Sequence, residues 1–221
     1  MQPRRGAFGR RSSYAALCIF STAFGWTEAS TVVYLRALTP LPPPLAAVQL
    51  PQVFLTSFLS GELVREACTM LLLASVSWLA ARRLRDFAGA FLLTFGLWDL
   101  VYYAVLRLLV GWPETLSSRD ILFLIPVPWV GPVWAPMTVA AIFVAAGTFL
   151  FQTPDRDVRY SVTDAAILLI SATAVVASFF VSWGSATAQQ YVPDAFRPWL
   201  YWAGLLAGGA WFIRVDVTCR S

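Results

Sequence analysis

Residues 87–110 have the sequence FAGAFLLTFGLWDLVYYAVLRLLV, in which only Asp99 and Arg107 carry a charge. An α-helix needs about 20 mostly apolar residues to cross the hydrocarbon core of a bilayer, and this stretch is long enough. The rest of the chain has similar blocks: 58% of the 221 residues are hydrophobic, 13% are charged, and the mean hydropathy is +0.67. Soluble domains carry about 25% charged residues. The sequence therefore predicts a helical integral membrane protein.

The apolar blocks predict an all-α fold with about six transmembrane helices. We expect one transmembrane domain over residues 14–216, between a basic cytoplasmic tail at 1–13 and a short cytoplasmic tail at 217–221. The expected spans are residues 14–36, 62–81, 87–110, 133–151, 162–183 and 198–213. At the start of the fifth span, Ser161 and Asp164 have the spacing of a capping box, which makes Asp164 a helix-start residue.

Two proline-rich segments interrupt this pattern. Proline removes an amide donor and clashes with the preceding helical turn, so dense prolines exclude a standard helix. Residues 38–60 contain five prolines, and we expect an extracytoplasmic loop there. Residues 121–136 contain Pro126, Pro128, Pro132 and Pro136. Because irregular backbone is tolerated at membrane depth only against protein or a wet cavity, we expect a re-entrant or interfacial segment before the fourth span.

The distribution of arginine predicts the orientation. The chain has no lysine, so arginine supplies all 16 basic residues. With the N-terminus inside, eleven arginines fall in inside segments and five in outward halves and loops. The positive-inside rule favours this arrangement, with both termini in the cytoplasm. The net charge of +4 then reflects topology, and no nucleic-acid partner is expected.

Missing residue types exclude several chemistries. The chain has no histidine, which excludes His-ligated haem, zinc and copper, a histidine general base and a Ser-His-Asp triad. Without lysine there is no Walker P-loop and no Schiff base. Cys18, Cys68 and Cys219 are scattered and form no CxxC motif, so neither a structural disulfide nor a thiolate metal site is expected.

Charged residues inside the first three spans are the main functional signal. Each costs at least about 2.5–3.5 kcal/mol to insert into a membrane, so each needs a reason. Because these spans run alternately outward and inward, the charged groups share the extracytoplasmic half of the bilayer. The predicted polar cluster consists of Glu28, Arg36, Glu62, Arg65, Glu66, Asp99, Tyr102, Tyr103 and Arg107.

Two interpretations of this cluster stay open. In the first, the charges only pair with one another and fix the register of the helices. In the second, they line a binding or catalytic cavity. The four carboxylates (Glu28, Glu62, Glu66 and Asp99) would then act as acid/base groups or as ligands of a hard divalent cation. The arginines would clamp an anionic headgroup, and the tyrosines would donate hydrogen bonds or protons.

Several motifs carry a resemblance to a known family. They are GWTEASTVVYLR at 25–36, ELVREA at 62–67, GLWDLVYY at 96–103, GWP at 111–113 and DILFLIPVPWVGP at 120–132. Over about residues 20–150 the chain resembles an uncharacterised family of bacterial multi-pass membrane proteins. The resemblance implies a shared fold in the bacterial cytoplasmic (inner) membrane and supplies no activity.

The sequence leaves two main functional hypotheses and does not decide whether the protein is an enzyme. One is a membrane protein that binds or processes an amphiphilic or anionic lipid-like ligand at the cluster. The other is a non-catalytic structural or assembly subunit of a larger membrane complex, with interfaces on the last two helices. Gly204 and Gly208, at GxxxG spacing, would allow close helix packing there. A transporter is disfavoured, because we find no internal repeat and few polar groups in the inner half.

Overall fold

The computed structural model describes residues 9–38, 52–125, 129–153, 158, 160–180 and 196–218. It divides into two compact units, and each is described by itself. Unit 1 comprises Met1–Ser118 and Trp134–Pro154, and unit 2 comprises Arg119–Val133 and Asp155–Ser221.

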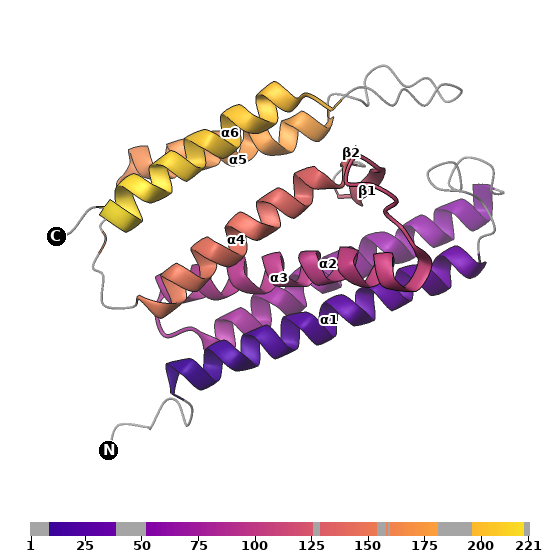
Figure 1. The fold of residues 1–221 in the computed structure, drawn as a ribbon, viewed down its shortest axis with the longest axis horizontal. Helices are drawn as coiled ribbons and strands as arrows, with labels where there is room; N and C mark the ends of the chain where they lie inside the picture. Colours follow the sequence, from indigo (N-terminus) through magenta and orange to yellow (C-terminus); the bar gives the residue numbers. More distant parts are fainter. Residues whose placement is uncertain are drawn as a thin grey trace. The chain divides into compact units, whose positions relative to one another are not determined.

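Unit 1 is a bundle of four helices: α1 (Arg10–Leu38), α2 (Gln52–Ala80), α3 (Leu84–Val110) and α4 (Trp134–Gln152) (Figure 1). Helix α3 is central, because it packs against each of the other three. Leu17 of α1, Leu93 of α3 and Phe151 of α4 form part of one core cluster, and Ala29 and Leu106 belong to a second, further along α1 and α3.

Glycines let the backbones of α3 and α4 touch. A Cβ atom on Gly89 would lie 2.7 Å from the amide nitrogen of Phe151, and one on Gly147 would lie 2.6 Å from the Gly89 carbonyl oxygen. A Cβ atom on Gly96 would collide with the Ala140 carbonyl oxygen in the same way. Small residues drive helix association in membranes because dispersion contacts replace the hydrophobic effect there.

Helix α2 begins earlier than expected. The sequence analysis extends the proline-rich loop to residue 60, whereas α2 already starts at Gln52. Residues 52–60 contain no proline, so their amide donors are intact and the helix can extend back to the residue after Pro51. The prolines between residues 40 and 51 lie outside the described residues.

Unit 2 contains a helical hairpin and a pair of short strands. Helices α5 (Val162–Phe180) and α6 (Pro198–Phe212) pack together, and α6 continues into a π-helical segment (Ile213–Thr218). A Cβ atom on Gly204 would lie 2.6 Å from the Ser171 carbonyl oxygen of α5. Gly204 therefore serves packing inside the chain. The Trp129 ring of the second strand stacks on Phe179 of α5, with ring centroids 6.3 Å apart.

The two strands occupy the predicted proline-rich segment. Strand β1 (Arg119–Phe123) pairs antiparallel with β2 (Trp129–Pro132), and Asp120 lies opposite Gly131. An all-α fold with irregular backbone in this segment is expected from the sequence, so the strand pair was not predicted. Prolines restrict the backbone to extended conformations and exclude a helix here. Residues 126–128, with two of the prolines, lie outside the described part.

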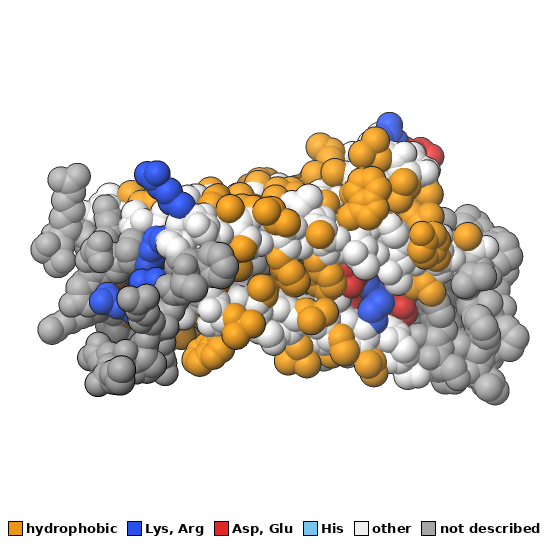
Figure 2. Space-filling model, turned by 90° about the horizontal axis from the view of Figure 1, so that it is seen from below, with side chains coloured by type: hydrophobic (Ala, Val, Ile, Leu, Met, Phe, Trp, Pro, Cys, Tyr) orange, Lys and Arg blue, Asp and Glu red, His pale blue; other side chains and the backbone are white. Residues whose placement is uncertain are grey.

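Five of the helices are long and apolar enough to cross a membrane: α1, α2, α3, α4 and α5. Helix α6 covers the sixth expected span, but it has 15 residues and is shorter than a bilayer crossing requires. On the face drawn in Figure 2, hydrophobic side chains cover the middle, and most arginine, aspartate and glutamate side chains lie towards the ends. These features indicate a membrane protein.

We expect Gly147→Ala to destabilise unit 1 by about 1–3 kcal/mol, because the added methyl group overpacks the contact between α3 and α4. The matched control is Gly61→Ala in α2, where a Cβ atom would meet nothing within 4 Å. Thermal unfolding of the detergent-purified variants measures the difference. Equal melting temperatures for the two variants would contradict the close α3–α4 approach.

Candidate polar site between the first three helices

Close packing of α1 on α3 places Glu28 inside the bundle. A Cβ atom on Gly25 would lie 2.7 Å from the Trp98 carbonyl oxygen, so the two backbones nearly touch at this level. Glu28 follows within one helical turn and therefore lies on the same side of α1. It is 7% exposed. A carboxylate buried in this way needs partners from the protein.

Arg65 of α2 supplies the main partner. Its Nη1 atom bonds to Glu28 Oε2, and its Nε and Nη2 atoms lie 3.0 and 2.8 Å from Glu62 Oε2. Glu62 precedes Arg65 by three residues, so both side chains lie on one face of α2. The Arg65 side chain is 27% exposed. One guanidinium group therefore joins two carboxylates and links α2 to α1.

Thr69 completes the coordination of Glu28. Its hydroxyl donates to Glu28 Oε1 at 2.9 Å, and the residue is 3% exposed. Both carboxylate oxygens of Glu28 are thus engaged. The sequence analysis does not include Thr69 in the cluster. Its position four residues after Arg65 places it on the same face of α2, and this spacing is the signal that could have identified it.

Aromatic residues of α3 lie beside the ion pairs. The Tyr102 phenol is close enough to interact electrostatically with Arg65. Its ring stacks on Trp98 at 6.3 Å and meets Tyr103 edge-on at 5.1 Å. Trp98 in turn stacks on Phe24 of α1 at 6.4 Å. The polar cluster therefore borders an aromatic layer that joins α1 and α3.

Of the predicted cluster, Glu28, Glu62 and Arg65 meet directly. Glu66 and Asp99 are half-buried and Tyr103 is buried. Arg107 donates to the Pro113 carbonyl oxygen at 3.1 Å and to that of Gly111. Both carbonyl groups follow the last residue of α3, so Arg107 links the helix to the loop after it. The side chain of Arg36 lies outside the described part of the structure.

The arrangement gives no support to a metal site. In the part of the chain that the structure describes, no three carboxylate or thiol groups are arranged to hold a metal ion. Arg65 lies between Glu28 and Glu62 and occupies the position that a cation would need. The observed interaction is charge pairing between α1 and α2.

A second cluster, which the sequence analysis does not predict, ties α1, α3 and α4 together. Arg10 lies 3.2 Å from Asp86, contacts the Phe151 carbonyl oxygen, and has its guanidinium carbon 5.2 Å from the centre of the Phe151 ring. Arg85 donates to the Leu150 carbonyl oxygen at 3.2 Å and to Thr153. From the sequence, Arg10 is expected in the basic tail. In the structure, Arg10 is the first residue of α1, and its side chain reaches the end of α4, where the last carbonyl groups have no donor within their own helix.

Unit 2 contains the predicted helix cap. The Asp164 carboxylate accepts hydrogen bonds from the Ser161 amide at 2.8 Å and the Ser161 hydroxyl at 2.6 Å, just before α5 begins. The role of Asp164 as a helix-start residue is confirmed. The structure adds that Trp211 of α6 donates to Asp164 at 2.8 Å, and that Tyr160 donates to the buried Asp216 at 2.9 Å. Both interactions lie where α5 begins and α6 ends, and they link the two helices there.

Comparisons with protein-family models, with curated proteins and with solved structures find no match to this chain. The family resemblance of the sequence motifs therefore stays a prediction, and functional inference rests on the geometry.

We expect Thr69→Val to destabilise the protein by about 1.5–3 kcal/mol, because it removes a hydrogen bond to a buried charged group. Thr27→Val is the control, since the exposed Thr27 hydroxyl bonds only to a carbonyl of its own helix. Thermal unfolding in detergent compares the two. A loss for Thr69→Val no greater than for Thr27→Val would show that Glu28 does not depend on this hydroxyl.

Proposed function

We propose that this protein is a non-catalytic structural or assembly subunit of a larger complex in the bacterial cytoplasmic membrane. One observation carries the proposal: the buried carboxylate of Glu28 has both oxygens engaged, by Arg65 and by Thr69. The cluster then acts as a register device that fixes α2 on α1. With both termini in the cytoplasm, it lies in the extracytoplasmic half of the membrane.

Full engagement argues against acid–base chemistry at Glu28. A general base must be free to accept a proton from a bound substrate within hydrogen-bond distance. Here that proton would have to displace the Arg65 guanidinium or the Thr69 hydroxyl. Breaking a buried ion pair costs about 3–5 kcal/mol, so the resting arrangement favours a structural role.

The surface of the bundle suits contact with other membrane helices. Val64 and Leu72 of α2 are largely exposed, as are Leu169 and Ile170 of α5. Within unit 1, α2 packs against α3 and α1. We therefore place the interfaces with other subunits on the remaining faces of α2 and of the last two helices.

Binding of an anionic, lipid-like ligand at the cluster is the second candidate. The observation in its favour is the partial exposure of the Arg65 side chain, at 27%. An anionic headgroup could replace Glu62 as a partner of Arg65, because the Glu62 side chain, at 16%, is more exposed than that of Glu28. Glu28 would then hold the arginine in place rather than act on the ligand.

Under the structural proposal, Glu28→Gln costs about 3–5 kcal/mol of stability, because it leaves Arg65 without its buried counter-charge. Neutralising both partners in Glu28→Gln/Arg65→Gln recovers much of that loss. The matched control is Glu62→Gln, which removes an i, i+3 pair and costs less than Glu28→Gln, because the Glu62 side chain is 16% exposed and that of Glu28 is 9% exposed. Thermal unfolding in detergent measures all three, beside the size of the native complex.

A different pattern would favour the ligand-binding candidate. There, Glu28→Gln leaves stability nearly unchanged because water screens the arginine, and the double variant restores nothing. The native complex would also keep its size in every variant.

The orientation is tested by cysteine accessibility in a background without the three native cysteines. With both termini inside, a cysteine at position 190 reacts with a membrane-impermeant reagent added outside intact cells, and a cysteine at position 157 does not. The reverse labelling pattern would refute the proposed orientation and the extracytoplasmic level of the cluster.

A further inference from the structure

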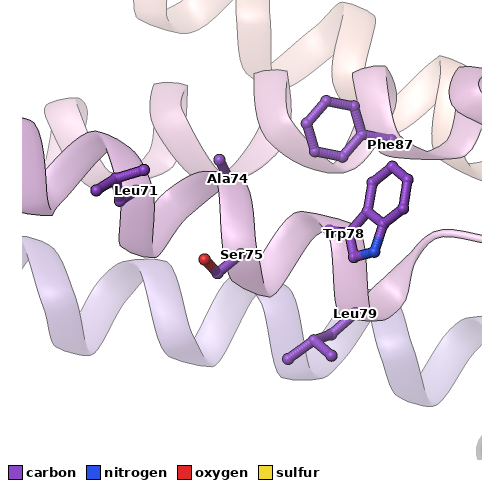
Figure 3. A pocket seen from close by; sticks show the side chains of 6 residues that line it. All are labelled: Leu71, Ala74, Ser75, Trp78, Leu79 and Phe87. Carbon is purple, nitrogen blue, oxygen red and sulfur yellow. The ribbon is translucent and has the colours of Figure 1, made fainter.

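A shallow groove runs along the surface of α2 beside the start of α3. It has a volume of about 400 Å³. Figure 3 shows Leu71 at one end and the rings of Trp78 and Phe87 at the other, with the small side chains of Ala74 and Ser75 between them. The lining residues are Leu71, Ala74, Ser75, Trp78, Leu79 and Phe87.

The walls of the groove are mainly apolar, as a binding site for a hydrocarbon chain requires. Trp78 and Phe87 meet edge to face with ring centroids 5.8 Å apart, which makes a firm apolar end. Leu71 and Leu79 stand out from the helix, and Leu79 is 84% exposed. Ala74 and Ser75 leave the hollow between these larger side chains. In a membrane this surface meets lipid chains, and its shape suits one of them.

Unengaged positive charge lies at the aromatic end of the groove. Arg82 and Arg83 follow Leu79 by three and four residues, in the turn before α3, and both are exposed. The neighbouring Arg10 and Arg85 are held by Asp86 and by the carbonyl oxygens at the end of α4. The backbone amide of Arg82 donates to Asp86. Among the described residues, the guanidinium groups of Arg82 and Arg83 have neither a carboxylate nor a carbonyl partner. Within the described residues, Arg82 and Arg83 therefore place positive charge without a carboxylate partner beside an apolar groove.

We propose that the groove binds one acyl chain of an anionic phospholipid whose phosphate pairs with Arg82 and Arg83. The lipid lies with its headgroup at the α2–α3 turn and its chain along Ala74 and Ser75 towards Leu71. Basic residues next to a transmembrane helix attract anionic lipids, and arginine fits phosphate with paired hydrogen bonds. A zwitterionic lipid has a cationic group beside its phosphate and gains less from the two arginines. This inference goes beyond the proposed subunit role and does not depend on it.

The test measures binding of phosphatidylglycerol and phosphatidylcholine to the detergent-purified full chain by native mass spectrometry during lipid titration. Each basic residue near a membrane surface contributes about 1 kcal/mol, which is roughly a fivefold change in affinity. We expect Arg82→Gln/Arg83→Gln to weaken phosphatidylglycerol binding about thirtyfold. The matched control is Arg197→Gln/Arg214→Gln, which removes the same charge from two exposed arginines of unit 2.

A second variant tests the groove itself. Ser75→Phe fills the hollow between Leu71 and Trp78 at an exposed position, so it blocks the chain without disturbing the core. We expect it to weaken phosphatidylglycerol binding while the arginines remain. Should the arginine variant fail to fold, the wild-type protein still tests the headgroup contact, because raised salt must weaken binding of the anionic lipid.

The proposal is overturned by any of three results. The first is equal affinity of the wild-type protein for the two lipids. The second is an equal loss in the unit 2 control, which would show a general charge effect. The third is unchanged phosphatidylglycerol affinity of Ser75→Phe, which would show that the lipid chain does not lie in the groove.

Discussion

A charged side chain inside a bilayer must find its partners within the protein, because no water is there to solvate it. The Arg65 guanidinium meets this constraint by joining Glu28 of α1 and Glu62 of its own helix. Each bond fixes the rotation of one helix relative to the other. Helix α1 approaches α2 less closely along its length than it approaches α3. The ion pair therefore adds specificity to the pairing of α1 with α2.

The same constraint acts at the helix ends. The last four carbonyl groups of a helix have no partner within it. Arg10 of α1 and Arg85 of α3 satisfy carbonyl groups at the end of α4. At the start of α5, Asp164 caps its own helix and also accepts a hydrogen bond from the Trp211 indole of α6. The polar groups at these two helix ends therefore also form tertiary contacts.

Between these polar helix ends, close contact at small residues determines how the helices pack. Glycines on α3 and α4 bring backbone against backbone, and Gly25 does the same between α1 and α3. A bundle held in this way places backbone against backbone between its helices. Its apolar outer faces and its basic turn between α2 and α3 remain available to other subunits and to lipids. This distribution supports the proposed role in assembly.

Much of this organisation could be predicted from local sequence. The length of the apolar runs determines the membrane class, and the capping box at Ser161 determines where α5 begins, because both depend only on neighbours along the chain. The sequence also indicated a polar cluster, since position along a helix follows from residue number. It could not determine that Arg65 rather than Arg107 pairs with Glu28, or that Thr69 also bonds to Glu28. Nor could it determine that Arg10 donates to a carbonyl group at the end of α4. Those choices depend on how each helix is rotated and which helix lies beside it, and only tertiary packing determines both.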